Sequence, residues 1–201
     1  MTEPETDEDL FIRIHSGDEQ AFVSLYRKRQ GGIFRFALHM SGSEAVAEDV
    51  TQEVFLAVIR ECGYDPRRGT LSGYLYGIAR KLVLRHLERG RTDPLLESDL
   101  DQAGLLEAAS DCDPLAEMTH REGIEALRRA VMALPRRYRE VVVLCDLEEV
   151  DYAEAAEVLG CPIGTVRSRL HRARGLLLEK LSQERQKRAG VSLWKPARCA
   201  V

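Results

Sequence analysis

Residues 151–181 carry the pattern that most restricts how this chain can fold. The stretch DYAEAAEVLG predicts a short helix, with Asp151 as its N-cap and Gly160 at its C-terminal end. The stretch CPIGTVRSRLHRARGLLLEKL follows, and Pro162 suits the first turn of a second helix. Two helices joined by a short turn that contains glycine predict a helix-turn-helix.

The second helix of this motif separates an apolar face from a basic face. At about 100° per residue, one narrow face holds the apolar residues Val166, Leu170, Ala173 and Leu177. The opposite face holds Arg167, Ser168, His171 and Arg172, and Arg169 and Arg174 flank the boundary. Residues 163–174 contain no acid, although the chain has a formal net charge of -4. Arginines on such a face can contact guanine edges or phosphates, so the pattern favours DNA binding over a solvated basic surface.

The other helical patterns and the composition indicate an all-α protein. Apolar residues recur at helical spacing near 18–38, 43–61, 71–88, 122–134 and 136–149, and Gly31-Gly32 predicts a kink or a break. The sequence shows neither a signal-peptide order nor an apolar run that could span a bilayer, so we expect a cytoplasmic protein without membrane insertion. The five cysteines show no C-x-x-C spacing, and we expect no metal site and no cofactor.

We predict two small helical domains joined by a flexible linker. The first domain spans 7–91 and the second 121–181. The stretch 92–120 is acidic and contains two Asp-Pro pairs, which is typical of a linker. Residues 182–201 are expected to form a C-terminal tail.

Three stretches resemble the extracytoplasmic-function (ECF) family of RNA polymerase sigma factors. AEDVTQEVFLAVIR is similar to sigma region 2.2, GTLSGYLYGIARKLVLRHLER to regions 2.3 and 2.4, and LPRRYREVVVLCDLEEVDYAEAAEVLGCPIGTVRSRLHRAR to region 4. The resemblance implies a sigma region 2 helical bundle followed by a region 4 helix-turn-helix. It also implies three partners: core RNA polymerase, contacted at its β′ clamp helices and β flap, promoter DNA, and an anti-sigma factor that wedges between the two domains.

The resemblance assigns roles to residues of this sequence. Region 4 reads the −35 element as duplex, which implicates Thr165, Arg167, Ser168, Arg169, His171, Arg172 and Arg174. Region 2 captures a base flipped from the −10 element, which implicates Arg67, Arg68, Gly69, Thr70, Leu71, Tyr74, Arg80, Lys81 and Arg85. The sequence has Tyr74 where the family usually has Trp, Lys81 where Asn is common and Arg85 where Asp is common. The promoter sequence of relatives therefore does not transfer to this chain.

The predicted helix over 43–61 carries an acidic, polar face. By resemblance, Glu48, Asp49, Gln52 and Glu53 would dock on the basic β′ clamp helices of core polymerase.

Two other classes of function are weighed against this one. A helix-turn-helix regulator that acts without being a polymerase subunit would need neither the acidic face nor the loop that captures a base. A metal-dependent nuclease would need more than clustered acids, and the sequence offers them no histidine partner and no phosphate-binding loop. We therefore expect a DNA-binding protein that is not an enzyme.

Overall fold

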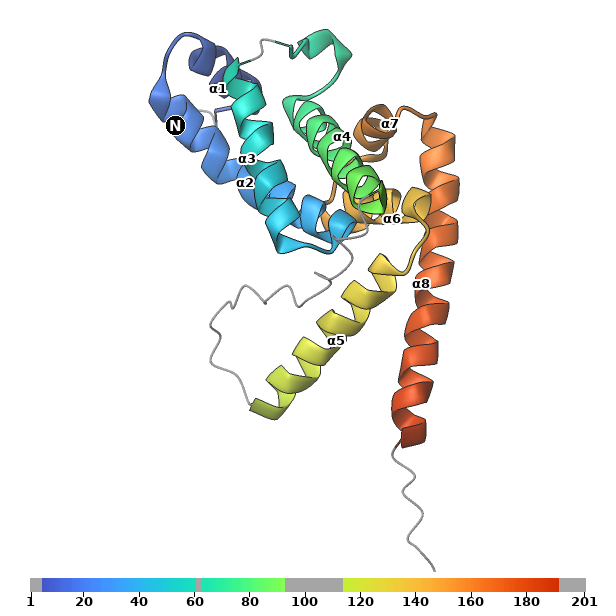
Figure 1. Cartoon of the computed structure of the whole chain (residues 1–201). Coiled ribbons are helices and arrows are strands. Elements are labelled where there is room, and N and C mark those ends of the chain that lie inside the picture. Colours follow the sequence, from blue (N-terminus) through green and yellow to red (C-terminus); the bar gives the residue numbers. More distant parts are fainter. Residues whose placement is uncertain (1–4, 61–62, 93–113, 192–201) are drawn as a thin grey trace, which may run out of the picture.

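A computed structural model of the chain shows an all-helical fold (Figure 1). It describes residues 5–60, 63–92 and 114–191, with side chains at 5–60, 63–89 and 122–183. The α-helices are α1 (Asp7–His15), α2 (Glu19–Ser41), α3 (Glu44–Arg60), α4 (Leu71–Thr92), α5 (Pro114–Met132), α6 (Arg136–Val142), α7 (Tyr152–Leu159) and α8 (Ile163–Val191). A 3-10 helix, η1 (Pro66–Arg68), precedes α4, and a π-helical turn, η3 (Val143–Leu147), follows α6. The described ranges contain no strand.

Helices α1 to α4 form the first group. Helix α1 is short, and the apolar pattern of the sequence did not reveal it. Its N-terminus is capped by Thr6, which forms a capping box with Asp9. Asp18 caps α2 by accepting hydrogen bonds from the backbone of the first turn. The apolar residues that recur at helical spacing along α3, namely Ala47, Val50, Val54 and Val58, are fully buried, and the helix packs on α2 and α4. The three long helices expected in this part of the chain are therefore confirmed.

The break expected at Gly31-Gly32 is wrong. Helix α2 runs without interruption from Glu19 to Ser41. A Cβ at Gly32 would stand only 2.8 Å from the Tyr76 hydroxyl of α4 and 3.3 Å from Glu148 Oε2. Gly32 therefore allows Tyr76 and Glu148 to pack closely against α2, and the helix continues through it without a break.

Helices α5 to α8 form the second group. The side chain of Asp151 caps α7, and Gly160 ends it in the left-handed conformation with φ 63°. Val166, Leu170 and Ala173 of α8 are at most 2% exposed, and Leu177 is 9% exposed. The predicted helix-turn-helix and its buried face are confirmed.

Two boundaries lie elsewhere than expected. Helix α5 begins at Pro114, inside the expected linker 92–120, because Pro is compatible with the first position of a helix. Helix α8 continues from 181 to Val191, into the expected tail, through residues with high helix propensity such as Gln, Glu, Arg and Lys. The remainder of both stretches, 93–113 and 192–201, lies outside the described residues.

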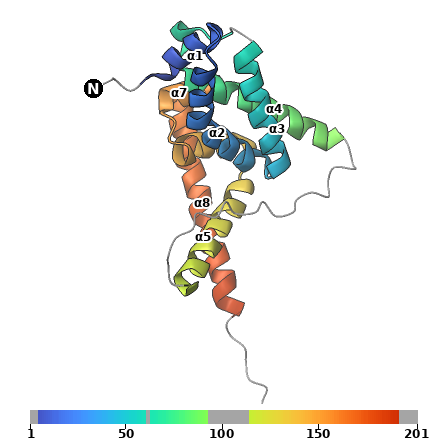
Figure 2. The same ribbon diagram turned by 90° about the vertical axis from the view of Figure 1, so that its left-hand side faces the viewer.

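The two groups of helices pack against each other. Helix α7 lies against α4, and α2 contacts α5, α6 and η3. The buried side chains of both groups form one connected apolar cluster. Below this body, α5 and α8 extend away from the first group in both views (Figure 1, Figure 2). Among the described residues, no helix is both long enough and apolar enough to cross a membrane.

Candidate nucleic-acid interface

The basic face of α8 is open to solvent. Arg167, Ser168, His171 and Arg172 are all exposed, opposite the buried face that anchors the helix. The Ser168 hydroxyl donates to the Thr165 carbonyl at 3.0 Å, which keeps this side chain close to the first turn. The turn itself is stabilised by the Pro162 carbonyl, which accepts from the Thr165 amide at 2.8 Å. This rigid, basic face has the shape and charge to enter a major groove.

The two arginines that flank this face differ in their surroundings. Arg174 makes a two-pronged ion pair with Asp146 of η3, at 3.0 Å from Nε and 2.5 Å from a terminal nitrogen. The hydrogen bond that Arg174 donates to Asp146 raises the pKa of Arg174. Arg169 is half-buried. Of the predicted residues, Arg174 is therefore placed to fix α8 against η3 as well as to add positive charge.

The loop before α4 is held in a fixed shape. Asp65 caps η1, and its carboxylate accepts hydrogen bonds from Arg67 Nε at 3.0 Å and from Arg67 Nη2 at 2.9 Å. These hydrogen bonds lower the pKa of the Asp65 carboxyl group. The Thr70 hydroxyl accepts from the Gly73 amide at 3.0 Å and so caps the first turn of α4. The Tyr64 hydroxyl donates to the Gly69 carbonyl at 3.0 Å. Burial raises the pKa of Tyr64 to about 12.

This loop and α4 enclose a pocket of about 340 Å³. Its wall includes five of the residues predicted to bind the −10 element, namely Arg68, Gly69, Thr70, Tyr74 and Lys81. The rings of Tyr64 and Tyr74 lie 5.7 Å apart at its rim, and Gly73 and Gly77 leave room along α4. Aromatic surfaces beside cations suit an unpaired nucleotide, because bases stack and phosphates need positive charge.

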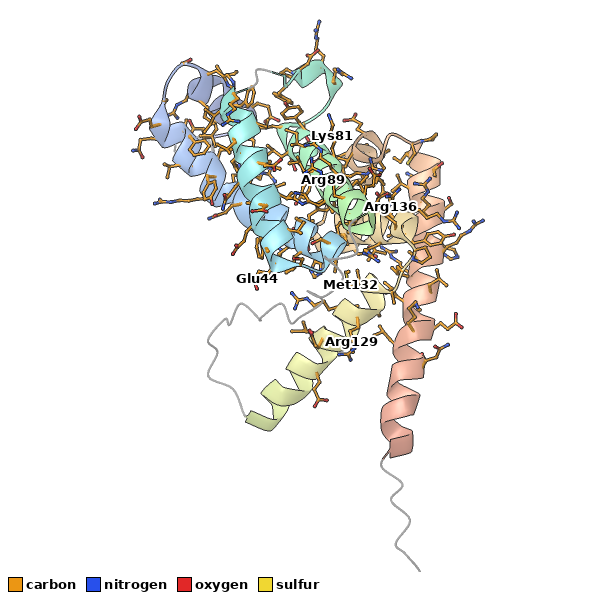
Figure 3. All side chains as sticks on the ribbon, in the orientation of Figure 1. Glu44, Lys81, Arg89, Arg129, Met132 and Arg136 are labelled. Carbon is orange, nitrogen blue, oxygen red and sulfur yellow. The ribbon has the colours of Figure 1, made fainter. Side chains whose placement is uncertain are left out.

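The acidic face of α3 lies on a different side of the first group. Glu48, Asp49, Gln52 and Glu53 are all exposed, and Figure 3 labels Glu44 at the start of the same helix. Glu44, Glu48 and Gln52 also border a shallow groove of about 730 Å³ between α2 and α3. Within the described residues no group of three or more His, Cys, Asp or Glu is placed to hold a metal ion. The acids on α3 therefore form an open, charged surface that suits a basic macromolecular partner.

Comparison with known proteins tests the resemblance. Residues 25–92 match the family described as Sigma-70 region 2, and residues 124–177 match Sigma-70, region 4. The chain is 32% identical over 191 residues to ECF RNA polymerase sigma-E factor of Escherichia coli, covering 90% of this chain and 97% of that protein. The chain belongs to the ECF RNA polymerase sigma factors. It is also 38% identical over 176 residues to ECF RNA polymerase sigma factor SigE of Mycolicibacterium smegmatis, covering 84% of this chain but 65% of that relative.

The structural comparison agrees with this assignment at the level of the fold. The sigma factor RpoE of Bartonella quintana, solved in complex with the anti-sigma factor NepR, superposes with a TM-score of 0.60 at 24% identity. The match covers 80% of this chain and 96% of that one. The expected all-α fold with regions 2 and 4 is thus confirmed, and the family matches and the curated relatives confirm the expected function as a sigma factor. The alternative of a regulator unrelated to polymerase is not favoured, because both sigma regions match on one chain.

Four of the predicted −10 residues of this sigma factor lie outside the pocket wall. Leu71 is fully buried in the core of region 2, with only its amide held by Glu8 at 3.1 Å. Arg80 faces region 4 and pairs with Glu140 at 3.3 Å. Arg67 and Arg85 are exposed, outside the pocket.

The pocket also contains residues that sequence reasoning missed. Tyr64 and Ile78 line it from region 2, and Glu157 and Val158 line it from α7 of region 4. Tyr64 directly precedes the loop DPRRG, and Ile78 lies one helical turn after Tyr74, so both had a local signal. Glu157 had none, because its position depends on how the two regions pack.

Proposed function

We propose that this ECF sigma factor directs transcription initiation through three separate surfaces. The acidic face of α3 binds core RNA polymerase, the basic face of α8 reads the −35 element as duplex, and the pocket beside α4 takes an unpaired base of the −10 element. The domain boundaries that go with these roles are 7–92 for region 2 and 114–191 for region 4, and the protein works in the cytoplasm, where polymerase is.

The observation that carries this proposal is that one chain presents both an exposed basic helix face and a separate pocket lined by cations and aromatic rings. The exposed face of α8 suits base pairs in a groove, because its arginines stand on a helix anchored by buried side chains. The pocket suits a single strand, because Tyr64 and Tyr74 offer rings for stacking beside Arg68 and Lys81. A protein that reads duplex and unpaired strand together fits promoter opening better than it fits simple repression.

Charge separates the polymerase surface from the DNA surfaces. Glu48, Asp49 and Glu53 would repel DNA phosphates, and they are exposed on one helix face. A basic partner such as the clamp helices of polymerase would be steered to this face and held in register by it.

An anti-sigma factor is the proposed regulator. The Bartonella quintana sigma factor that shares this fold was solved with such a protein bound. The faces of regions 2 and 4 that pack on each other here would offer a partner of this kind a large, partly apolar surface once separated.

Run-off transcription with purified protein, core RNA polymerase and a pool of upstream genomic fragments tests the proposal. We expect specific transcripts that are lost with Arg172→Ala, which removes a base-reading side chain, and with Asp49→Ala, which weakens polymerase binding. Arg60→Ala and Glu179→Ala remove exposed charges of the same sign elsewhere and should leave transcripts unchanged. DNA binding without transcripts and without polymerase association would overturn the proposal.

A further inference from the structure

The short helix α1 is fixed beside the loop that precedes α4. It contacts α2, α3 and α4, and in both views it lies at the same end of the first group of helices as η1 (Figure 1, Figure 2). Asp7, which opens α1, is 5% exposed and pairs with Lys28 and Arg29 of α2. The Phe11 ring is buried and meets the Tyr64 ring edge-on, with the ring centres 5.2 Å apart. None of the three surfaces of the proposed function includes α1, although it touches the loop of one of them.

Glu8 of α1 reaches both ends of this loop. Its Oε1 atom accepts a hydrogen bond from the Leu71 amide at 3.1 Å. The Tyr64 hydroxyl shares its proton between the same oxygen, at 3.3 Å, and the Gly69 carbonyl, at 3.0 Å. One carboxylate oxygen therefore joins the residue where the loop begins to the residue where α4 begins.

The Leu71 amide needs an acceptor from outside its own helix. Leu71 is the first residue of α4, and the first amides of a helix have no acceptor within it. Thr70 accepts from the Gly73 amide, and Glu8 provides the acceptor for Leu71 from a different helix. A negative charge is also favourable at this end of a helix. Because Leu71 is fully buried, loss of Glu8 would leave its amide without a partner unless the loop moved.

A second contact ties the start of α4 to α1. Arg29, the partner of Asp7, donates to the Ser72 hydroxyl at 3.4 Å. The first two residues of α4 are thus connected to α1, Leu71 directly and Ser72 through Arg29. Such connections fix where the loop 64–70 ends.

The position of this loop decides the shape of the unpaired-base pocket. Tyr64, Arg68, Gly69 and Thr70 line the pocket, and three of them lie between the two points that Glu8 holds. Within the described part of the chain, Glu8 itself does not line this pocket. Side chains that contact a ligand select it well only when neighbouring residues hold them in place. Glu8 is placed to do this for the loop without touching the DNA.

We propose that Glu8 is a positioning residue for capture of the unpaired base. Through Leu71 and Tyr64 it holds the loop 64–70 in the shape that accepts one base of the −10 element, so the preference for that base depends on α1. This inference rests on the proposed role of the pocket in binding unpaired DNA.

The test uses three variants of the full-length protein, each combined with core RNA polymerase. Glu8→Ala removes the acceptor, and Glu8→Gln removes the charge but keeps an oxygen that can accept from the Leu71 amide. Glu19→Ala is the matched control, because Glu19 is an exposed acid in the first turn of the next helix, α2. Run-off transcription is performed on one active upstream fragment with its −10 element randomised, and the templates of the transcripts are sequenced.

We expect Glu8→Ala to reduce the preference for the captured base by about tenfold, because a hydrogen bond between a buried amide and a charged group is lost. Glu8→Gln should keep most of this preference, and Glu19→Ala should keep all of it. A variant that merely folds less well would give fewer transcripts from every template and would leave the ratio between bases unchanged. A wild-type ratio in Glu8→Ala, or an equal loss in Glu8→Gln and Glu8→Ala, would overturn the inference.

Hydrogen–deuterium exchange of the free protein tests the same contact without DNA or polymerase. The amides of 64–71 should exchange faster in Glu8→Ala than in the wild type, and Glu8→Gln should restore their protection. If the wild type gives no specific transcripts, the proposed function fails, and equal exchange in wild type and Glu8→Ala would then refute the contact as well. If specific transcripts form and the base ratio is unchanged in Glu8→Ala, the role of Glu8 is wrong and the sigma function stands.

Discussion

Among the charged residues, Arg139 is the one whose truncation should lower the free energy of unfolding the most. It lies on α6 and is only partly exposed. Its guanidinium donates to the Met40 carbonyl near the end of α2 at 2.8 Å, to the Leu134 carbonyl at 3.2 Å and to the Met132 carbonyl at the end of α5. The last carbonyls of a helix have no partner within the helix, so one arginine satisfies the ends of two helices in different regions.

The size of the effect follows from these three bonds. A hydrogen bond from a charged donor contributes about 1.5–3 kcal/mol, so three independent bonds would contribute about 4.5–9 kcal/mol. They share one guanidinium, and water can reach part of the site after truncation, so we expect Arg139→Ala to lower the free energy of unfolding by about 3 kcal/mol. Burial of the guanidinium restricts the water around its charge and so lowers the pKa of Arg139. Arg139→Lys should recover only about 1 kcal/mol, because one ammonium cannot span three carbonyls.

Urea unfolding followed by circular dichroism at 222 nm measures this loss. The matched control is Arg137→Ala, which removes an exposed arginine from the same helix whose guanidinium lies 4.8 Å from the centre of the Tyr138 ring. That contact is worth about 0.5–1 kcal/mol at an exposed site. If Arg139→Ala costs no more than Arg137→Ala, the argument that this residue caps two helices is refuted.

Substitutions at four other residues give further predictions. Arg172→Ala should weaken binding of the −35 duplex by about 1–3 kcal/mol in an equilibrium titration. Arg174→Ala should lower the free energy of unfolding by about 0.5–1 kcal/mol, and a double-mutant cycle should show that this effect is coupled to that of Asp146→Ala. Leu170→Ala should lower the free energy of unfolding by about 2–5 kcal/mol, because the side chain is 2% exposed; a value below 1 kcal/mol would contradict its place in the core. Burial, assisted by nearby arginines, lowers the pKa of His39 from 6.5 to about 4. Between these two pH values the unfolded chain binds more protons than the folded one, so the free energy of unfolding falls as the pH drops from 6.5 towards 4. His39→Gln should reduce this loss by about 1–3 kcal/mol, measured by urea titrations at pH 7 and pH 4.5.

Helix α8 was the most predictable part of the chain. Its faces depend on the period of an α-helix alone, and the buried side of α8 is the one that the projection gives. Asp151 and Gly160 bracket α7 for reasons of local hydrogen bonding and backbone conformation, which sequence also carries. Local sequence rules were thus sufficient for features that depend on one helix alone, such as its ends and its buried face.

The errors arose where a residue type has two structural uses. Gly31-Gly32 fits a break as well as close packing, and only the position of Tyr76 on another helix decides between them. Pro114 follows an Asp in an acidic stretch, which suits a linker, yet it also suits the first position of α5. Leu71 adjoins the loop in sequence but turns into the core, because it opens α4 on the face that packs inward.

Arg80 shows why the boundary between the two regions could not be predicted. Its sequence context is a basic helix, from which DNA binding is the natural expectation. Its partner, Glu140, lies sixty positions away on α6, in a stretch that reads as apolar core. Glu140 is 4% exposed, and a buried carboxylate without a cation nearby would be costly, so the pair has to form if region 4 packs on region 2 as it does here.

The distribution of acids explains how an acidic protein can carry a strongly basic helix without contradiction. Acids on α3 are exposed and suit a basic protein partner, whereas Glu148 pairs with Arg35 of region 2 and Glu157 lines the same pocket as Arg68 and Lys81. A free protein with an open basic pocket would bind any nucleic acid through phosphate contacts, because this attraction does not depend on sequence. Raising the salt concentration should therefore weaken binding of single-stranded DNA by the wild type more steeply than binding by Lys81→Ala, and equal salt slopes would show that this pocket cation makes no phosphate contact.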